Sequence, residues 1–138
     1  MLRTPLMRAI VEAESESCRW ELKQDWHYTV RPDKDGEHPE VHCVIKAGYR
    51  WDGASKPWHD RAVFVLPSSH WKMVVPSLEH DDLCDRRNGY ASVGINSIHA
   101  ARHFRRMCAR YLVDWADVVK MYWAVRLGGP RWERTDLS

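Results

Sequence analysis

The chain has 138 residues, a formal net charge of +2, and 44% hydrophobic and 11% aromatic residues. This length suits a single domain, residues 1–138, with a real core, and the apolar content excludes a disordered chain. The weak net charge does not favour nucleic acid as a partner. The stretch from Ala101 to Arg110 holds four arginines and a histidine, and we expect it to be the solvated face of a helix.

Eight tryptophans are many for a chain of this size. Tryptophan is enriched at interfaces and on the rims of clefts, so we expect some of them there. The start of the chain lacks the apolar core of a secretory signal, and no apolar run approaches the ~20 residues that a membrane helix needs. We therefore expect synthesis in a reducing cytoplasm, no transmembrane segment, and free thiols at the four dispersed cysteines.

Strand and turn signals dominate the first half. Residues 1–17 could form an N-terminal arm or a short helix. Residues 20–30 and 41–51 are rich in aromatic and β-branched residues and predict two strands. Asp35-Gly36 lies between them as a turn signal, which predicts a β-hairpin or a small antiparallel sheet. The apolar run at residues 61–67 could be a strand or a buried loop.

Helical signals dominate the second half. Three helices are predicted: one from Ser77, as its cap, to about Arg87, ended by Asn88-Gly89; one capped by Asn96 or Ser97; and one capped by Asp114 and stopped by Gly128-Gly129-Pro130. The tail, residues 130–138, is expected to be loose or to pack through Trp132 alone. The predicted class is α+β, a small antiparallel sheet or hairpin followed by about three helices.

The stretch "LEHDDLCD", residues 78–85, carries the most chemistry. On a helix, His80 and Cys84 are four residues apart and share a face, so with Asp81 they could ligate a divalent metal such as zinc or calcium. A histidine beside an acid could also act as a general base. The alternative is a buried histidine hydrogen-bonded to a neighbour.

The loop "YRWDGASKPW", residues 49–58, is the second candidate site. Asp52 can accept backbone N–H groups in a rigid turn, or can join His80 and Asp81 as a third catalytic residue. Ser55 could be a nucleophile if a base lies nearby. Ser55, Trp51 and Trp58 are the residues of this loop that we expect to bind a ligand.

A pair of histidines lies on the second predicted helix. His99 and His103 are four residues apart, but Arg102 and Arg106 flank them, and nearby cations disfavour a bound metal ion. We expect this pair to lie on a solvated helix face.

Four segments together resemble a known family. They are "GYRWDGASKP", "LEHDDLC", "AARHFRRMC" and "MYWAVRLGG", and they span Gly48 to Gly129, about three fifths of the chain. Their order resembles the domain of unknown function 1353 family, small proteins encoded largely by phages and prophages. The resemblance implies a phage or prophage source but supplies no function.

Two positions depart from the family pattern. The tyrosine that often follows the His-Asp-x-Leu motif is Cys84 here, and the aspartate that often lies three residues before the helix phenylalanine is Ala101. His-Asp followed by tyrosine also looks like the catalytic helix of secreted phospholipases of the A-two class. That likeness implies His80 as the base and Asp81 as a calcium ligand, but the paired cysteines and the glycine-rich calcium loop of those enzymes are missing here.

Three functions follow as hypotheses. The first is an accessory or structural component of a phage particle, in the tail, baseplate or connector, that contacts other phage proteins or a second copy of itself through tryptophan and arginine side chains. The second is a small hydrolase, metal-assisted or not and directed at phospholipid or peptidoglycan, with His80, Asp81 and Asp52 at its site. The third is an inhibitor of a host defence protein.

Overall fold

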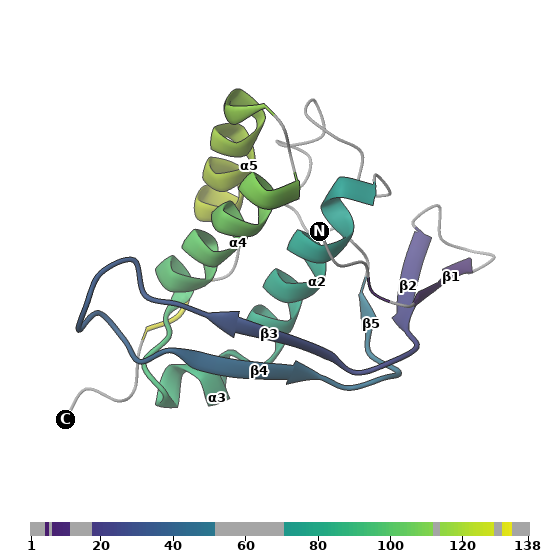
Figure 1. The fold of residues 1–138 in the computed structure, drawn as a ribbon, viewed down its shortest axis with the longest axis horizontal. Helices are drawn as coiled ribbons and strands as arrows, with labels where there is room; N and C mark the ends of the chain where they lie inside the picture. The colour runs from purple at the N-terminus through teal and green to yellow at the C-terminus, as the bar shows by residue number, and fades with distance from the viewer. Residues whose placement is uncertain are drawn as a thin grey trace.

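The computed structural model describes residues 5, 7–11, 18–51, 71–111, 114–128 and 131–133. Its elements in chain order are β1 (Met7–Val11), β2 (Cys18–Leu22), β3 (Trp26–Val30), β4 (Val41–Ile45), β5 (Arg50–Trp51), α2 (Trp71–Asp85), α3 (Arg87–Ser92), α4 (Ser97–Tyr111) and α5 (Trp115–Gly128). Small antiparallel sheets therefore precede helices, which confirms the predicted α+β class (Figure 1). Residues 7–11, for which a helix was one expectation, form a strand that pairs with β2.

The predicted hairpin is present. Strands β3 and β4 pair antiparallel, and the loop between them turns at Asp35-Gly36, where Gly36 has a φ of +81°. The backbone N–H of Glu37 donates to the carbonyl of Lys34 to close this turn. Glycine adopts this left-handed conformation without the steric penalty that a Cβ brings, so the turn signal in the sequence had a physical basis.

The prediction of one strand at residues 20–30 and another at 41–51 was wrong in its continuity. Each segment is broken into two strands, and β2 and β3 belong to different sheets. The pairs Trp20–Trp51 and Trp26–Ile45 nevertheless keep one register. Between them the Asp25 carboxylate accepts the backbone N–H of Ala47 at 2.9 Å. At this point the Asp25 side chain, and not a backbone carbonyl, accepts the N–H of Ala47, and the two sheets separate here.

The first long helix starts earlier than predicted. Helix α2 begins at Trp71, so Ser77 is not a cap but lies inside the helix, directly after Pro76. Val74 and Val75 are buried in the core, and this apolar burial favours the extra turns although Pro76 cannot donate a backbone hydrogen bond. The Ser77 hydroxyl donates to the carbonyl of Val74 instead.

The end of α2 also differs from the prediction. Asn88-Gly89 does not end this helix but lies within the short helix α3, and the break falls at Arg86, where φ is −106° and ψ is 27°. The side chain of Arg87 donates to the carbonyl of Cys84, which is one of the last carbonyls of α2. This side-chain bond satisfies a helix end that the Asn-Gly signal was expected to satisfy.

Helix α4 has the predicted cap. The Asn96 side chain accepts the backbone N–H of His99, and the His99 ring accepts the backbone N–H of Asn96, both at 3.0 Å. This is a reciprocal capping box with histidine in the place usually held by glutamate or glutamine.

We expect Asn96→Ala to lower the free energy of unfolding by about 1 kcal/mol, because one orphan N–H of the helix loses its acceptor. Urea unfolding followed by circular dichroism measures it. Asn88→Ala is the matched control. Asn88 is exposed inside α3, so the change should cost less than about 0.5 kcal/mol. Equal losses in the two variants would contradict a capping role for Asn96.

Helix α5 also begins and ends as predicted. The Asp114 carboxylate accepts the backbone N–H of Ala116 at 2.9 Å, and the helix ends at Gly128. In the short tail segment, Trp132 donates its indole N–H to the carbonyl of Ile95, while its own carbonyl accepts the N–H of Ser97. Trp132 therefore holds residues 131–133 against the start of α4.

Helix α2 is the centre of the packing. It contacts α4 on one side and α5 packs in turn against α4, while the β3–β4 ribbon crosses α2 (Figure 1). The inward residues of β3, namely Trp26, Tyr28 and Val30, alternate with outward ones and join the core. Among the described residues, no helix is long and apolar enough to cross a bilayer.

Candidate functional site

Four successive polar side chains of α2 are buried. Glu79, His80, Asp81 and Asp82 are each at most 3% exposed. A helix that packs on one face normally buries one or two polar positions in a row, and buried acids are costly unless they are paired. The middle of α2 is therefore enclosed on all sides, and each buried acid needs a compensating partner.

Asp82 is compensated by three side chains. It accepts the hydroxyls of Tyr28 at 2.6 Å and Tyr90 at 2.9 Å, and it pairs with Arg86 at 2.7 and 2.8 Å. Burial, followed by the negative charge of Asp82, raises the pKa of Tyr28 well above its ordinary value. The tyrosines therefore stay protonated as donors, and the cluster fastens β3 to α2 and α3.

Glu79 joins three elements. One carboxylate oxygen accepts the indole N–H of Trp26 on β3 at 2.8 Å. The other lies 2.7 Å from Nε2 of His103 on α4. An ionised carboxylate only accepts, so Nε2 of His103 carries the proton and donates it. The other ring nitrogen of His103, Nδ1, is buried and has no hydrogen-bond partner among the described residues.

His80 of the LEHDDLCD stretch is buried beside Phe104 and Cys84. The His80 ring packs edge-on against Phe104, with ring centroids 5.2 Å apart, and Sγ of Cys84 lies 3.7 Å from its ring nitrogens. His80 and Cys84 thus share a face, as their spacing predicted. Asp81 is one residue on and points about 100° away around the helix. Among the described residues, His80, Asp81 and Cys84 do not form a set of three converging ligand atoms.

The predicted loop site falls largely outside the described residues. Asp52, Ser55 and Trp58 all lie there, so their predicted roles stay predictions. Trp51 is described: it lies on β5, pairs with Trp20 and stacks on Tyr49. Only 3% of it is exposed, so it belongs to the core.

The prediction that His99 and His103 lie on a solvated helix face was wrong. His99 is 6% and His103 is 2% exposed, because His99 closes the helix cap and His103 bonds to Glu79. One signal in the sequence could have indicated this. His103 lies three residues after Ala100 and four before Met107, which puts it on the apolar face of α4.

A pocket of about 460 Å³ lies beside the Glu79–His103 pair. Its walls come from β3, β4, α2 and α4, and its described lining residues are His27, Tyr28, Thr29, Arg31, His42, Cys43, Glu79, His103, Arg106, Met107 and Arg110. This volume suits a small ligand. The pocket therefore places a buried acid–imidazole pair next to a mainly basic wall.

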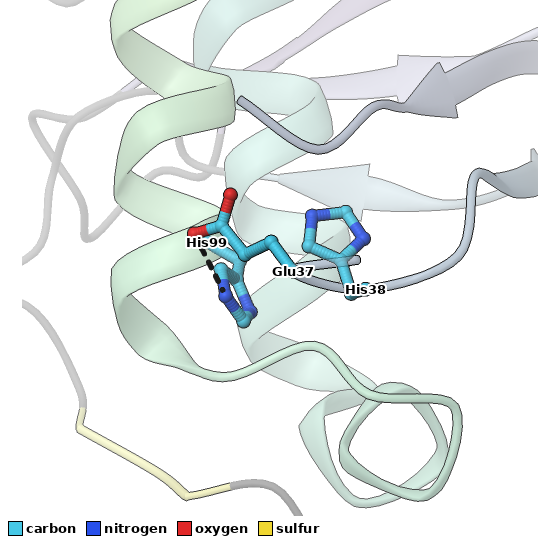
Figure 2. Close-up of side chains that lie close together, drawn as sticks. All are labelled: Glu37, His38 and His99. Atoms are coloured by element: carbon cyan, nitrogen blue, oxygen red, sulfur yellow. Dashed lines mark ion pairs between the residues drawn. The ribbon is translucent and has the colours of Figure 1, made fainter. Parts of the chain in front are cut away.

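A second cluster contains Glu37, His38 and His99. Figure 2 shows the hairpin loop bringing Glu37 and His38 to the start of α4, with the Glu37 carboxylate 3.3 Å from Nε2 of His99. One ligand atom from each of the three residues lies within 4.8 Å of the others. The two imidazole rings are 4.5 Å apart. By composition and spacing this is a candidate metal site.

The hydrogen bonds of this cluster do not fit a metal ion. Nδ1 of His99 accepts the backbone N–H of Asn96, so the ring proton lies on Nε2, which faces Glu37 and has no lone pair to offer. Arg102 also donates to the Glu37 carboxylate. The cluster is complete as a tie between the hairpin loop and α4.

This tie should make the chain sensitive to acid. Burial acts to raise the pKa of Glu37, but the backbone N–H of Asp33 and the positive charge of Arg102 outweigh it, with a smaller lowering contribution from the His99 ring, so the pKa falls below its ordinary 4.5. The stabilisation is therefore complete above about pH 4.5 and is lost as pH falls through the lower, folded-state pKa.

We expect Glu37→Gln to show a shallower loss of stability than wild type between about pH 5 and pH 3, measured by urea unfolding. Glu40→Gln is the control, because Glu40 is exposed and its nearest cation, Arg31, is 3.9 Å away. If Glu37→Gln kept the wild-type profile, Glu37 would not contribute to acid lability.

The fold and site define a small α+β domain. In it, a helix with buried polar side chains packs against a β-ribbon, beside a pocket lined by basic residues. The chain matches no family model, and no curated protein or solved structure is significantly similar to it.

Proposed function

We propose that the chain is an accessory or structural component of a phage particle that docks onto another particle protein. The phage source rests on the resemblance of four segments to the domain of unknown function 1353 family. The docking role is supported by one structural observation, the apolar outer stripe of α5.

This stripe consists of residues that recur every four positions. Trp115 is 67%, Trp123 52% and Leu127 56% exposed, and Val119 lies between them with part of its surface accessible. Val118, Met121 and Val125 bury the opposite side of the helix. Large exposed aromatic side chains are unusual on a monomer and typical of protein interfaces. The partner best suited to this stripe is a protein with an apolar groove.

The test is mass spectrometry of washed particles from the strain that carries the gene. The chain should be present at a constant ratio to the capsid protein. Trp123→Ser should lower this ratio at least about tenfold, because an interface anchor is lost. Lys120→Ser, which replaces an exposed polar residue of the same helix, should not. Absence of the chain from washed particles would overturn the proposal.

A hydrolase is the second candidate, and the Glu79–His103 pair favours it. Glu79 holds the ring so that the lone pair lies on Nδ1, the arrangement of an oriented general base. Nδ1 is buried, so a side-chain movement must first expose it to the pocket; it could then take a proton from a water molecule, whose oxygen would attack an ester. This reading moves the proposed base from His80 to His103, because His103 lines the pocket.

A panel of carboxylic and phosphate esters tests this candidate. His103→Gln can still donate to Glu79, so the fold should be kept while turnover falls at least about 100-fold. Turnover that survives in this variant would exclude His103 as the base. If no ester is turned over, the hydrolase candidate is excluded and the role in the phage particle is the one that remains.

A further inference from the structure

The pocket beside Glu79 and His103 is dominated by cations. Arg106 and Arg110 come from the last turns of α4, and Arg31 comes from the end of the hairpin. Arg110 is exposed and has no acidic partner among the described residues. All three arginines line one pocket of about 460 Å³, although the Arg106 guanidinium also donates to the carbonyl of Arg31 and to Asp33.

Nearby acids neutralise only part of this charge. Asp33 is shared by Arg102, Arg105 and Arg106. Glu40 lies 3.9 Å from Arg31, and Glu79 at the floor is bound to Trp26 and His103. The C-terminal end of α4 contributes about half a negative charge. Among the described residues that line the pocket itself, three are arginines and one, Glu79, is an acid, so the lining carries more positive than negative side chains.

Polar residues of the β3–β4 ribbon also line the pocket. Thr29 and His42 face each other across the β3–β4 ladder, with Thr29 Oγ1 2.8 Å from His42 Nδ1. His27 lies on the same strand as Thr29 and also lines the pocket. His103 lines the pocket too, and its Nδ1 is buried with no hydrogen-bond partner among the described residues, which is rare for a polar atom in a folded protein. The residues that line the pocket thus carry hydroxyl, imidazole and guanidinium groups.

We propose that this pocket binds the phosphate group of a small phosphate monoester. Guanidinium groups bind phosphate oxygens through paired, charge-assisted hydrogen bonds, and threonine and histidine commonly complete such sites. A phosphate has the charge to meet the excess of arginines, and the pocket has room for more than the phosphate alone. This inference rests on neither proposed function, since it concerns binding and not docking or turnover.

Calorimetric titration of the full chain with inorganic phosphate is the test. We expect saturable binding at one site, weakened at least about tenfold by Arg110→Ala and by Arg106→Ala, since each removes a charge-assisted contact. Arg110→Ala should fold normally, because this residue is exposed, and its melting temperature checks this. Arg126→Ala is the matched control, an arginine in the last turn of α5 that does not line the pocket.

Two further probes distinguish the source of the phosphate. Glycerol 3-phosphate in solution represents a soluble monoester, and vesicles with phosphatidic acid represent a lipid headgroup. Binding of either with the same dependence on Arg110 and Arg106 supports the inference. No saturable binding up to about 10 mM phosphate, or binding that neither arginine variant weakens, would overturn it.

Discussion

Glu79→Ala is expected to lower the free energy of unfolding by about 3–5 kcal/mol, the cost of removing one partner from a buried charged network. Glu79 is 1% exposed and binds Trp26 and His103 through its two oxygens. Without it, the buried indole N–H and the buried imidazole each lose the hydrogen bond to this carboxylate, and the shorter side chain leaves a cavity. Urea unfolding at neutral pH measures the loss.

A conservative variant and a double-mutant cycle separate the causes. Glu79→Gln keeps an oxygen for Trp26 and the side-chain volume, so it should cost about 1–2 kcal/mol. In a cycle of Glu79→Ala with His103→Ala, the two changes should couple by about 1–3 kcal/mol because they share one hydrogen bond. Additive losses would show that the Glu79–His103 contact does not stabilise the fold.

Asp82→Ala is expected to cost about 3 kcal/mol. Two buried tyrosine hydroxyls, those of Tyr28 and Tyr90, lose their acceptor. Arg86 also loses its carboxylate, but half of its side chain is exposed and can be solvated, so it adds less. Far-ultraviolet circular dichroism during urea unfolding gives the value.

Asp85→Ala is the matched control for both acids of α2. Asp85 lies on the same helix, is exposed, and accepts one hydrogen bond from Tyr49 at 2.6 Å. Its removal should cost less than about 1 kcal/mol. If Asp82→Ala were as mild as Asp85→Ala, the burial of Asp82 would carry no energetic weight.

Local signals predicted much of the fold. The Asp35-Gly36 turn, the Asn96 and Asp114 caps and the stop at Gly128 all appear where the sequence places them. Each of these features depends on residues within a few positions along the chain, so the local sequence is enough to predict it. The start of α2 was mispredicted because core burial outweighed a local cap, and its end because a side-chain bond closed it instead.

The candidate site was predicted less well. Within "LEHDDLCD", attention to His80, Asp81 and Cys84 missed Glu79 and Asp82, which make the long-range bonds. An acid next to a histidine is visible in the sequence, but which of four successive polar residues meets which strand depends on the rotation of α2 against β3 and α4.

The sequence by itself determined the α+β class, the hairpin, the start of α4 and both ends of α5, because turns and caps are short-range chemistry. The tertiary structure alone decided that the indole of Trp26, 53 residues away, and the imidazole of His103, 24 residues away, meet at Glu79. It also brought arginines from the hairpin and from α4 to one pocket. Such meetings depend on how helices and strands pack, and packing is a property of the whole core and not of any one segment.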